Sequence, residues 1–521
     1  MNQSLKSAAR DPQSFVLLLL IALYVAARLW RLTASCLWFD ELFSVHAARH
    51  AWPGLWRFVA ADLIHPPLFY ALLKLWVGAG GESVYWLRLF PVAASVAAII
   101  PLLLLARELR LGAAATNVAL LFAAANGYLV KYAQEVRMYG LLLLLTLTSL
   151  WLFARLLKDE GRARGLLSAL FLFNLLLVYT HYYGWLVVSC EAVFLALRAR
   201  RRLGHFMLTV AGLFVAYVPW VVACWRAAGA GRGLAQNIGW IARPGVRDLF
   251  ELFALFNQPF YFRQSSADPL FARAGALLGL LLVGLPVFVL LFQKLKRRDE
   301  GDEGEGWAVE FLLTFTLLPV ALAFAASYVL PQSVWGTRHL VVSAGPYALL
   351  AGVALARLRP VWWRWAALTL LGCWLALSGA LLLARREPPH VWCAWEGLAA
   401  SAAREEKGTA DVYAFEDLVA YHLWFALERE GRFRVASVKG AGVVEDPAYF
   451  LPRDFQGVNV ADADALRGER FWAAFRDTDW DESHQPLKLI LERGYRPERT
   501  YETAAQGQRA FLVLFVREGS R

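Results

Sequence analysis

Long apolar runs dominate the first 384 residues and most strongly limit what this chain can fold into. Several runs approach the roughly 20 residues that a helix needs to cross the hydrocarbon layer of a membrane, and short clusters of Lys and Arg separate them. A run such as residues 277 to 292 carries apolar residues on every face of a helix. Strands of a membrane barrel alternate apolar and polar residues, so the pattern predicts membrane-spanning helices.

The charge distribution supports a membrane protein with basic loops on one side. The net charge of +11 comes from residues 1 to 384, which hold 34 basic and 19 acidic side chains, whereas residues 385 to 521 hold 19 and 23. An excess of Lys and Arg beside spanning helices is typical of cytoplasmic loops. Binding of nucleic acid requires an exposed basic face, which this pattern does not indicate, so we expect no nucleic-acid partner.

The basic clusters predict the topology. If they lie in the cytoplasm, we expect about 11 spans with the N-terminus inside and the C-terminus outside. The apolar stretch 68 to 79 is too short to cross, so we interpret it as re-entrant or interfacial. If it crosses, the count becomes 12 or 13. The predicted spans are residues 15 to 32, 84 to 106, 113 to 130, 138 to 155, 165 to 180, 184 to 197, 206 to 224, 271 to 292, 308 to 328, 339 to 356 and 365 to 384.

The composition becomes mixed and polar after the last predicted span. Residues 410 to 416 and 509 to 516 are strand-like, and a helical pattern follows the first of them. We therefore predict two domains, a polytopic transmembrane catalytic domain of residues 1 to 384 and an extracytoplasmic soluble α/β domain of residues 385 to 521. The five cysteines contain no CxxC pair, and we do not expect Cys36 and Cys393 to form a disulfide.

The segments predicted to face outward collect the unusual polar residues. Ionisable groups near the hydrocarbon region cost about 2.5 to 3.5 kcal/mol on insertion scales, so they tend to line cavities and to be paired or functional. These segments are WFDE from Trp38, HPP from His65, KYAQEVRMY from Lys131, THYY from Thr180 and TRH from Thr337.

Two chemical roles are represented in these segments. Asp40 and Glu41 follow the first span, and on a regular helix neighbouring side chains diverge by about 100°, so the two carboxylates have different roles unless the loop is irregular. A partly desolvated carboxylate suits a general base. Cations suit a phosphate, and Arg binds it best through two parallel hydrogen bonds. The candidate cations are Arg28, Arg31, His65, Lys131, Arg137, Arg338 and His339.

The order of these motifs resembles the GT-C superfamily of membrane glycosyltransferases. WFDELFSVHAARH, IHPPLFYALLKLW, YAQEVRMYGLLLLL, THYYG and RHL are similar in particular to glycosyltransferase family 39, the protein O-mannosyltransferase type, whose relatives include lipid A aminoarabinose transferases. The resemblance covers about residues 14 to 384. It implies a mainly α polytopic membrane protein and inverting sugar transfer from a polyprenyl-phosphate carrier.

The resemblance also implies roles for single residues. Asp40 matches the base or acceptor-orienting group, Glu41 matches a supporting residue or a metal ligand, and Arg338 matches a phosphate ligand. The aminoarabinose transferases read Glu-Lys-Pro-Pro where this chain has Ile64 and His65 before Pro66 and Pro67, which disfavours that substrate. The substrate-binding candidates are His65, Lys131, Gln134, Glu135, Arg137, Tyr139, His181, Arg338 and His339.

The expected activity is transfer of a sugar from a polyprenyl-phosphate donor to a lipid, protein or glycan acceptor. We expect it at the outer face of a bacterial inner membrane, among membrane lipids. No cofactor is indicated except a divalent metal ion, for which Asp40 and Glu41 are the candidate ligands. Two alternatives remain open: a polysaccharide ligase or polymerase that uses a diphosphate-linked glycan, and a transporter without enzymatic activity. The sequence shows no internal repeat of the kind common in transporters.

Overall fold

The structure is a computed structural model and falls into two compact units. The helical unit comprises residues 1–32, 63–76 and 86–385, and the sheet unit comprises residues 33–62, 77–85 and 386–521. The structure describes residues 12–158, 163–229, 238–239, 241–260, 277–296, 303–384, 393–439, 455, 457–477, 479–505 and 508–519.

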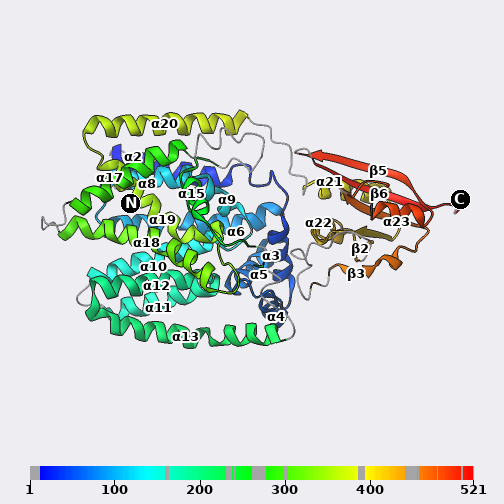
Figure 1. Ribbon diagram of the computed structural model, residues 1–521, viewed down its shortest axis with the longest axis horizontal. Helices are drawn as coiled ribbons and strands as arrows, with labels where there is room; N and C mark the ends of the chain where they lie inside the picture. The colour runs from blue at the N-terminus through cyan, green and yellow to red at the C-terminus, as the bar shows by residue number, and fades with distance from the viewer. Residues whose placement is uncertain are drawn as a thin grey trace. The chain divides into compact units, whose positions relative to one another are not determined.

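The helical unit is a bundle of apolar helices, several of which run side by side in Figure 1. Its elements are α2 (Pro12–Leu29), α5 (Leu68–Gly80), α6 (Val84–Ala97), α7 (Ile99–Glu108), α8 (Gly112–Ala125), α9 (Gly127–Gln134), α10 (Tyr139–Lys158), α11 (Ala163–Thr180), α12 (Gly184–Arg198), α13 (Arg200–Gly229), α15 (Val246–Asn257), the π-helical η1 (Leu280–Gly284), α17 (Leu285–Lys296), α18 (Glu303–Val329), the 3₁₀ turn η2 (Thr337–Leu340), α19 (Val341–Ala356) and α20 (Val361–Ala384). Helices α5 and α6 each extend for a few residues into the sheet unit.

The bundle confirms the predicted fold class of a polytopic helical membrane protein. In the described residues, six helices are long and apolar enough to cross a membrane, and five shorter apolar helices accompany them. The long ones are Val84–Glu108, Tyr139–Lys158, Arg200–Gly229, Gly306–Val329, Thr337–Ala356 and Val361–Ala384, and the shorter ones are Gln13–Leu29, Leu68–Gly80, Gly112–Ala125, Arg164–Thr180 and Leu277–Phe292.

Two of the predicted spans do not match a single described helix. The span predicted for residues 113 to 130 is wrong, because α8 ends at Ala125 and α9 begins at Gly127. Between them Asn126 adopts an extended conformation and its side chain accepts a hydrogen bond from the Leu129 N–H, which is an N-cap. Residues 271 to 276 of another predicted span lie outside the described residues.

A closed ring of polar side chains joins α10, α11 and α12 inside the bundle. The Ser149 hydroxyl oxygen lies 2.6 Å from Asn174 Oδ1 and 2.6 Å from Glu191 Oε1, and Asn174 Nδ2 lies 2.8 Å from Glu191 Oε2. All three side chains are fully buried. The hydroxyl has one hydrogen and can donate to only one of its two neighbours. The Asn174 amide can be placed in two orientations. In both, each of the three contacts has a donor and an acceptor only when the Glu191 carboxyl group carries a proton. The ring therefore requires a neutral carboxylic acid.

This ring predicts different losses of stability for two substitutions of Glu191. We expect Glu191→Gln to melt close to the wild-type temperature, because an amide also supplies one donor and one acceptor. We expect Glu191→Leu to destabilise the protein by about 1–2 kcal/mol, because it removes the hydrogen bonds of Glu191 to Ser149 and Asn174. Thermal melting in detergent compares the two variants. Equal losses of stability in both would show that the ring needs an ionised carboxylate.

The sheet unit contains a mixed six-stranded sheet with helices on both faces. The strand order is β3-β2-β1-β4-β6-β5, with parallel pairing from β3 to β4 and antiparallel pairing among β4, β6 and β5. The strands are β1 (Ala410–Ala414), β2 (Phe433–Lys439), β3 (Asn459–Asp462), β4 (Arg470–Arg476), β5 (Tyr495–Ala505) and β6 (Gln508–Arg517), and the helices are α3 (Phe39–Arg49), α4 (Trp52–Asp62), α21 (Ala394–Glu405), α22 (Asp417–Leu427) and α23 (Leu487–Glu492), with the short turns η4 (Glu428–Glu430) and η5 (Ala463–Ala465).

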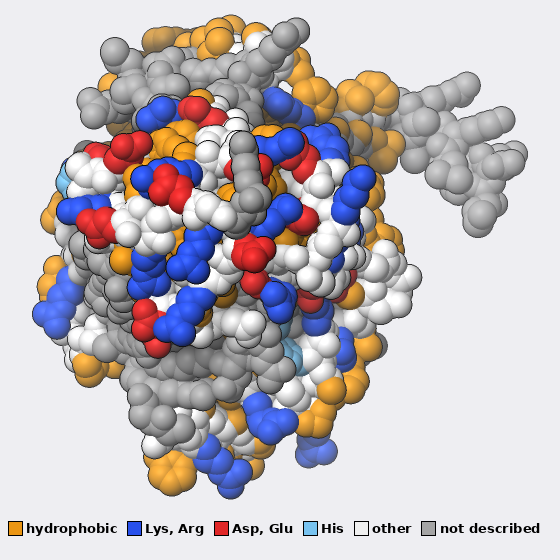
Figure 2. All heavy atoms as spheres, turned by 90° about the vertical axis from the view of Figure 1, so that its right-hand side faces the viewer, with side chains coloured by type: hydrophobic (Ala, Val, Ile, Leu, Met, Phe, Trp, Pro, Cys, Tyr) orange, Lys and Arg blue, Asp and Glu red, His pale blue; other side chains and the backbone are white. Residues whose placement is uncertain are grey.

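Both faces of this sheet carry buried apolar side chains, and helices cover both faces. One core contains α21 and α22 with alternate residues of β1, β4 and β6, and a second core on the opposite face contains α23. The face shown in Figure 2 carries Lys and Arg side chains interspersed with Asp and Glu. Ion pairs in the sheet unit include Arg434 with Asp411 and Arg509 with Asp477. A surface of this kind is typical of a domain in contact with water.

Candidate functional site

Three buried histidines from distant parts of the chain meet in the helical unit. His65 precedes α5, His181 follows α11, and His339 lies in η2. Their ring centroids are 5.2 Å apart for His65 and His181, 6.0 Å for His65 and His339, and 4.6 Å for His181 and His339. None is more than 8% exposed. The structure therefore brings together three of the residues predicted to bind substrate.

Close backbone approaches hold two of these histidines in place. A Cβ atom at Gly184 would lie 2.8 Å from the carbonyl carbon of Leu177 in α11, so only glycine allows the turn that carries His181 to close against this helix. A Cβ at Gly336 would lie 2.6 Å from Nδ1 of His339, so glycine also leaves room for that ring. The THYYG and GTRH segments thus owe their geometry to a glycine at one end.

Arg137 is a buried cation beside the three histidines. It precedes α10 and is only 3% exposed. Its Nη1 donates a hydrogen bond to the Tyr70 hydroxyl at 3.2 Å, and its Nη2 lies 3.2 Å from Nδ1 of His65. Tyr139 is also buried and stacks near His339, with ring centroids 6.3 Å apart. Sequence reasoning missed Tyr70, although it follows the HPP segment by only three residues.

The histidines are neutral at physiological pH because of burial and nearby positive charge. Burial lowers the pKa of His65 well below its usual value, and the positive charges of Arg137 and Arg338 lower it further. Burial and the same two guanidinium groups lower the pKa of His181 to about 3. Arg338 is half-buried and directly precedes His339 in η2. The site therefore combines neutral imidazoles with permanent cations.

Two other predicted residues have structural partners. The Gln134 side-chain amide donates to the carbonyl oxygens of Arg28 and Trp30, both at 2.9 Å, and so caps the end of α2. Arg28 is fully buried and donates to Ser95 Oγ at 2.9 Å and to the carbonyl oxygens of Tyr24 and Ala123. The hypothesis that Arg28 contacts phosphate is therefore wrong, because its donors hold helices together inside the bundle.

The remaining candidates in the same segment are less buried. Lys131 and Glu135 are half-buried, and the Lys131 ammonium lies 5.3 Å from the centroid of the Tyr132 ring. Arg31, at the end of the first predicted span, is exposed and has a positive φ of 50°. None of the described contacts of these three residues assigns them a role.

Asp40 and Glu41 lie in the first turn of α3, in the sheet unit. Since α3 is a regular helix, the two side chains diverge and have different surroundings, as one of the sequence alternatives required. Glu41 is fully buried, and its Oε2 accepts a hydrogen bond from the backbone N–H of Trp38 at 3.0 Å. Asp40 is half-buried. Because Glu41 caps the helix, Asp40 is the better candidate for a chemical role.

Helix α3 packs on the C-terminal part of the chain. The Phe39 ring lies 5.0 Å from that of Tyr421 in α22, and Arg49 forms ion pairs with Glu82 and Glu428. Cys36 and Cys393 form a disulfide, with Cα atoms 5.1 Å apart. The prediction that they stay unpaired is wrong. Their sequence separation of 357 conceals that both belong to one compact unit.

The disulfide predicts that the position of α3 depends on oxidation. We expect Cys36→Ser with Cys393→Ser to destabilise the sheet unit by about 2–4 kcal/mol and to lower any activity that uses Asp40. Gel mobility after thiol alkylation, with and without reductant, reports the bond in the purified protein. Cys373→Ser is the matched control, because Cys373 is an exposed free cysteine. Wild-type stability in the double variant would contradict this account.

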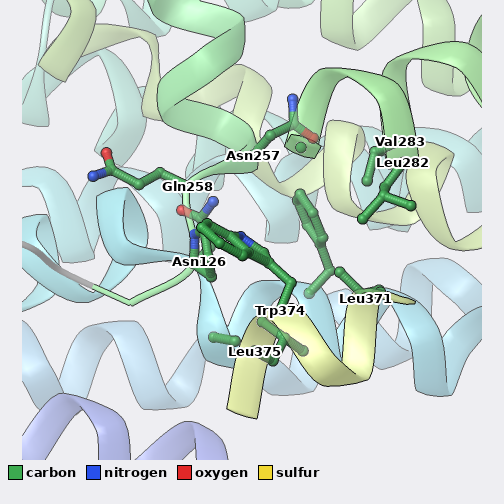
Figure 3. A pocket seen from close by; sticks show the side chains of 12 residues that line it. Asn126, Asn257, Gln258, Leu282, Val283, Leu371, Trp374 and Leu375 are labelled. Carbon is green, nitrogen blue, oxygen red and sulfur yellow. The ribbon is translucent and has the colours of Figure 1, made fainter. Parts of the chain in front are cut away.

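An apolar pocket lies elsewhere in the helical unit, between α8, α15, η1 and α20 (Figure 3). Its two buried asparagines are already hydrogen-bonded: Asn126 Nδ2 donates to the carbonyl oxygen of Phe256, and Asn257 Oδ1 accepts from the Tyr347 hydroxyl. Gln258 also lines the pocket, and the other side chains there are apolar. They include Phe122, Leu282, Val283, Leu371, Trp374 and Leu375.

Comparison with solved structures identifies the fold. No protein-family model and no curated protein matches the chain by sequence. ArnT from Cupriavidus metallidurans bound to undecaprenyl phosphate is similar over 98% of this chain and 99% of its own, with 13% identity and a TM-score of 0.59. ArnT without ligand gives 13% identity, a TM-score of 0.55 and coverage of 96% and 98%.

A third structure extends the similarity to another class of transferase. The archaeal oligosaccharyltransferase AglB from Archaeoglobus fulgidus, in complex with an inhibitory peptide and a dolichol-phosphate, shares 14% identity over 96% of this chain and 74% of its own, with a TM-score of 0.51. These proteins are members of the GT-C superfamily. The chain therefore has the GT-C fold, which confirms the fold that the sequence motifs indicated.

Proposed function

We propose that the protein is an inverting glycosyltransferase that uses a polyprenyl-phosphate sugar. The observation that carries this proposal is the buried group formed by Arg137 and the three histidines, with Arg338 beside it, inside a bundle of apolar helices. Such a group suits a phosphate that is attached to a lipid chain, because cations stabilise the charge and the apolar surroundings accommodate the chain. The carriers bound to ArnT and AglB, undecaprenyl phosphate and dolichol-phosphate, are of this chemical class.

The proposed reaction assigns one role to each group of candidate residues. Asp40 accepts the proton of the acceptor's nucleophilic group as that group attacks the anomeric carbon of the sugar. The bond between the anomeric carbon and the phosphate oxygen breaks, and the electron pair leaves with the polyprenyl phosphate. Arg137 and Arg338 stabilise the phosphate as its negative charge grows. Attack from the face opposite the leaving group inverts the anomeric centre.

The acceptor and the location are part of the same proposal. We propose a lipid, protein or envelope glycan acceptor and an active site at the outer face of a bacterial inner membrane. The disulfide in the sheet unit supports this side of the membrane, because disulfides persist in oxidising compartments.

Mass spectrometry of envelope lipids, glycans and proteins, with and without this gene, tests the proposed function. We expect one class of molecule to lose a sugar when the gene is deleted and to regain it when the wild-type gene is restored. Restoring the Asp40→Asn form is expected to leave the sugar absent. Identical envelopes in all strains would contradict the proposal.

A further inference from the structure

The three histidines form the group in the described residues that most suggests a metal site. One ring nitrogen from each of His65, His181 and His339 lies within 4.8 Å of the other two. Three imidazoles of this kind hold zinc in many enzymes. The hydrogen bonds on the other ring nitrogens test whether a metal ion fits here.

His181 has the wrong proton arrangement for a metal ligand. The backbone N–H of Tyr183 donates a hydrogen bond to Nδ1 of His181 at 3.0 Å, so Nδ1 carries a lone pair. In the neutral ring the proton is then on Nε2. That atom is buried and has no hydrogen-bond partner among the described residues. Coordination through Nε2 would require loss of this proton, and coordination through Nδ1 would break the bond to Tyr183.

His65 shows the same pattern with a different donor. Nη2 of Arg137 lies 3.2 Å from its Nδ1 and 3.5 Å from its Nε2, and a guanidinium can only donate. The shorter contact favours Nδ1 as the acceptor, and with that hydrogen bond the neutral ring of His65 carries its proton on Nε2. Histidines that bind metals almost always donate their second N–H to a carboxylate, a carbonyl or water. Here Nδ1 of His181 accepts a hydrogen bond, and both ring nitrogens of His65 face a donor on Arg137, which is the reverse arrangement.

Charge also favours a negatively charged ligand, and the spacing of the three rings allows one. Arg137 and Arg338 lie close enough to lower the pKa of His181, and the same charges would repel a metal cation. Three nitrogens bound to one zinc lie about 3.3 Å apart, whereas three N–H groups that donate to a single oxygen lie about 4.7 Å apart. The ring nitrogens of the three histidines lie within 4.8 Å of one another, which leaves room for three N–H groups around one oxygen.

We propose that His65, His181 and His339 form an oxyanion site in which neutral imidazoles donate N–H groups, and that they are not ligands of a metal ion. Nε2 of His339 is likewise buried and has no hydrogen-bond partner in the described part of the chain. This inference rests on the proposed function for the identity of the ligand, which is the phosphate of a polyprenyl carrier. The arginines then supply the charge, and the histidines supply directed hydrogen bonds in a site that holds little water.

Direct binding of farnesyl phosphate, a short prenyl monophosphate, to the full-length protein in nanodiscs tests this site. The measurement needs neither a sugar nor an acceptor, so it does not depend on catalysis. His181→Leu removes the donor and should weaken binding about tenfold or more. His181→Gln places an amide N–H near the position of Nε2 and should bind within about threefold of wild type. The matched control is His422→Leu, which changes another buried histidine whose Nδ1 lies 2.7 Å from the Leu418 carbonyl oxygen.

Metal analysis of the same samples distinguishes an oxyanion site from a metal site. We expect no stoichiometric zinc in the wild-type protein and no change in binding after treatment with EDTA. Glutamine is a poor zinc ligand, so a metal site would be lost in His181→Gln as well as in His181→Leu. Stoichiometric zinc that disappears in both variants would overturn the inference, and so would wild-type binding by His181→Leu. If His181→Leu does not fold, as judged by thermal melting, the pair His339→Leu and His339→Gln decides by the same criteria.

The outcomes also distinguish this inference from the proposed function. A protein that binds farnesyl phosphate through its histidines but transfers no sugar would retain the oxyanion site and refute the transferase. A protein that transfers sugar while His181→Leu binds farnesyl phosphate normally would retain the transferase and refute the oxyanion site.

Discussion

Asp40→Asn is expected to lower the rate of sugar transfer by about 10²-fold to 10⁴-fold, the usual contribution of a general base. The amide has nearly the shape of the carboxylate but cannot accept the acceptor's proton at neutral pH. Asp40 lies in the first turn of α3, where loss of its charge costs only about 0.3–1 kcal/mol of helix stability. The variant should therefore remain folded and should still bind the carrier lipid. Initial rates with a purified prenyl-phosphate sugar give the measurement.

The neighbouring residue provides the matched control. Glu41→Gln keeps an oxygen that can accept the hydrogen bond from the Trp38 N–H, so the N-terminal cap of α3 survives. We expect this variant to retain transfer within a few-fold of wild type. If both variants lose activity equally, the two carboxylates act together, for example as ligands of one metal ion. Wild-type turnover by Asp40→Asn would remove Asp40 from the mechanism.

Arg338→Ala is expected to lower kcat/KM for the prenyl-phosphate donor by about 10-fold to 100-fold. A hydrogen bond to a charged group is worth about 1.5–3 kcal/mol, and the loss should grow as charge develops on the leaving phosphate. Arg338→Lys keeps the charge without the planar pair of donors and should give an intermediate loss. Steady-state kinetics with varied donor concentration separates these cases.

An exposed arginine serves as the control for Arg338. The Arg247 side chain in α15 is 88% exposed and pairs only weakly with Glu251 one turn away. Arg247→Ala should leave kcat/KM unchanged. Equal donor kinetics for Arg338→Ala and the wild type would refute the assignment of Arg338 as a phosphate ligand.

The fold was predictable because hydrophobic length and local pattern determine most of its elements. The apolar runs indicated the helices of the bundle, and the strand-like segments near residues 410 and 510 correspond to β1 and β6. The span predicted for residues 113 to 130 failed because a single N-cap, Asn126, ends one helix and starts the next. Hydropathy averages over such a residue, so the break is visible only when the local hydrogen bond is considered.

The candidate site was predictable in its residue types but not in its partners. The sequence pointed to His65, Arg137, His181 and His339, and the structure brings these four together. The sequence could not show that Arg28 and Gln134 have structural roles instead. These roles depend on which backbone carbonyl oxygens lie within hydrogen-bond distance of the two side chains. The Cys36–Cys393 disulfide was missed for a similar reason, since its two cysteines have a sequence separation of 357.

The identity of the sugar donor tests the central claim most directly. Purified protein in nanodiscs would be given the same sugar on a prenyl monophosphate, on a prenyl diphosphate and on a nucleotide, and the release of each carrier would be measured. We predict turnover with the prenyl monophosphate alone and production of free prenyl phosphate. Turnover with the diphosphate or the nucleotide, and none with the monophosphate, would contradict the account.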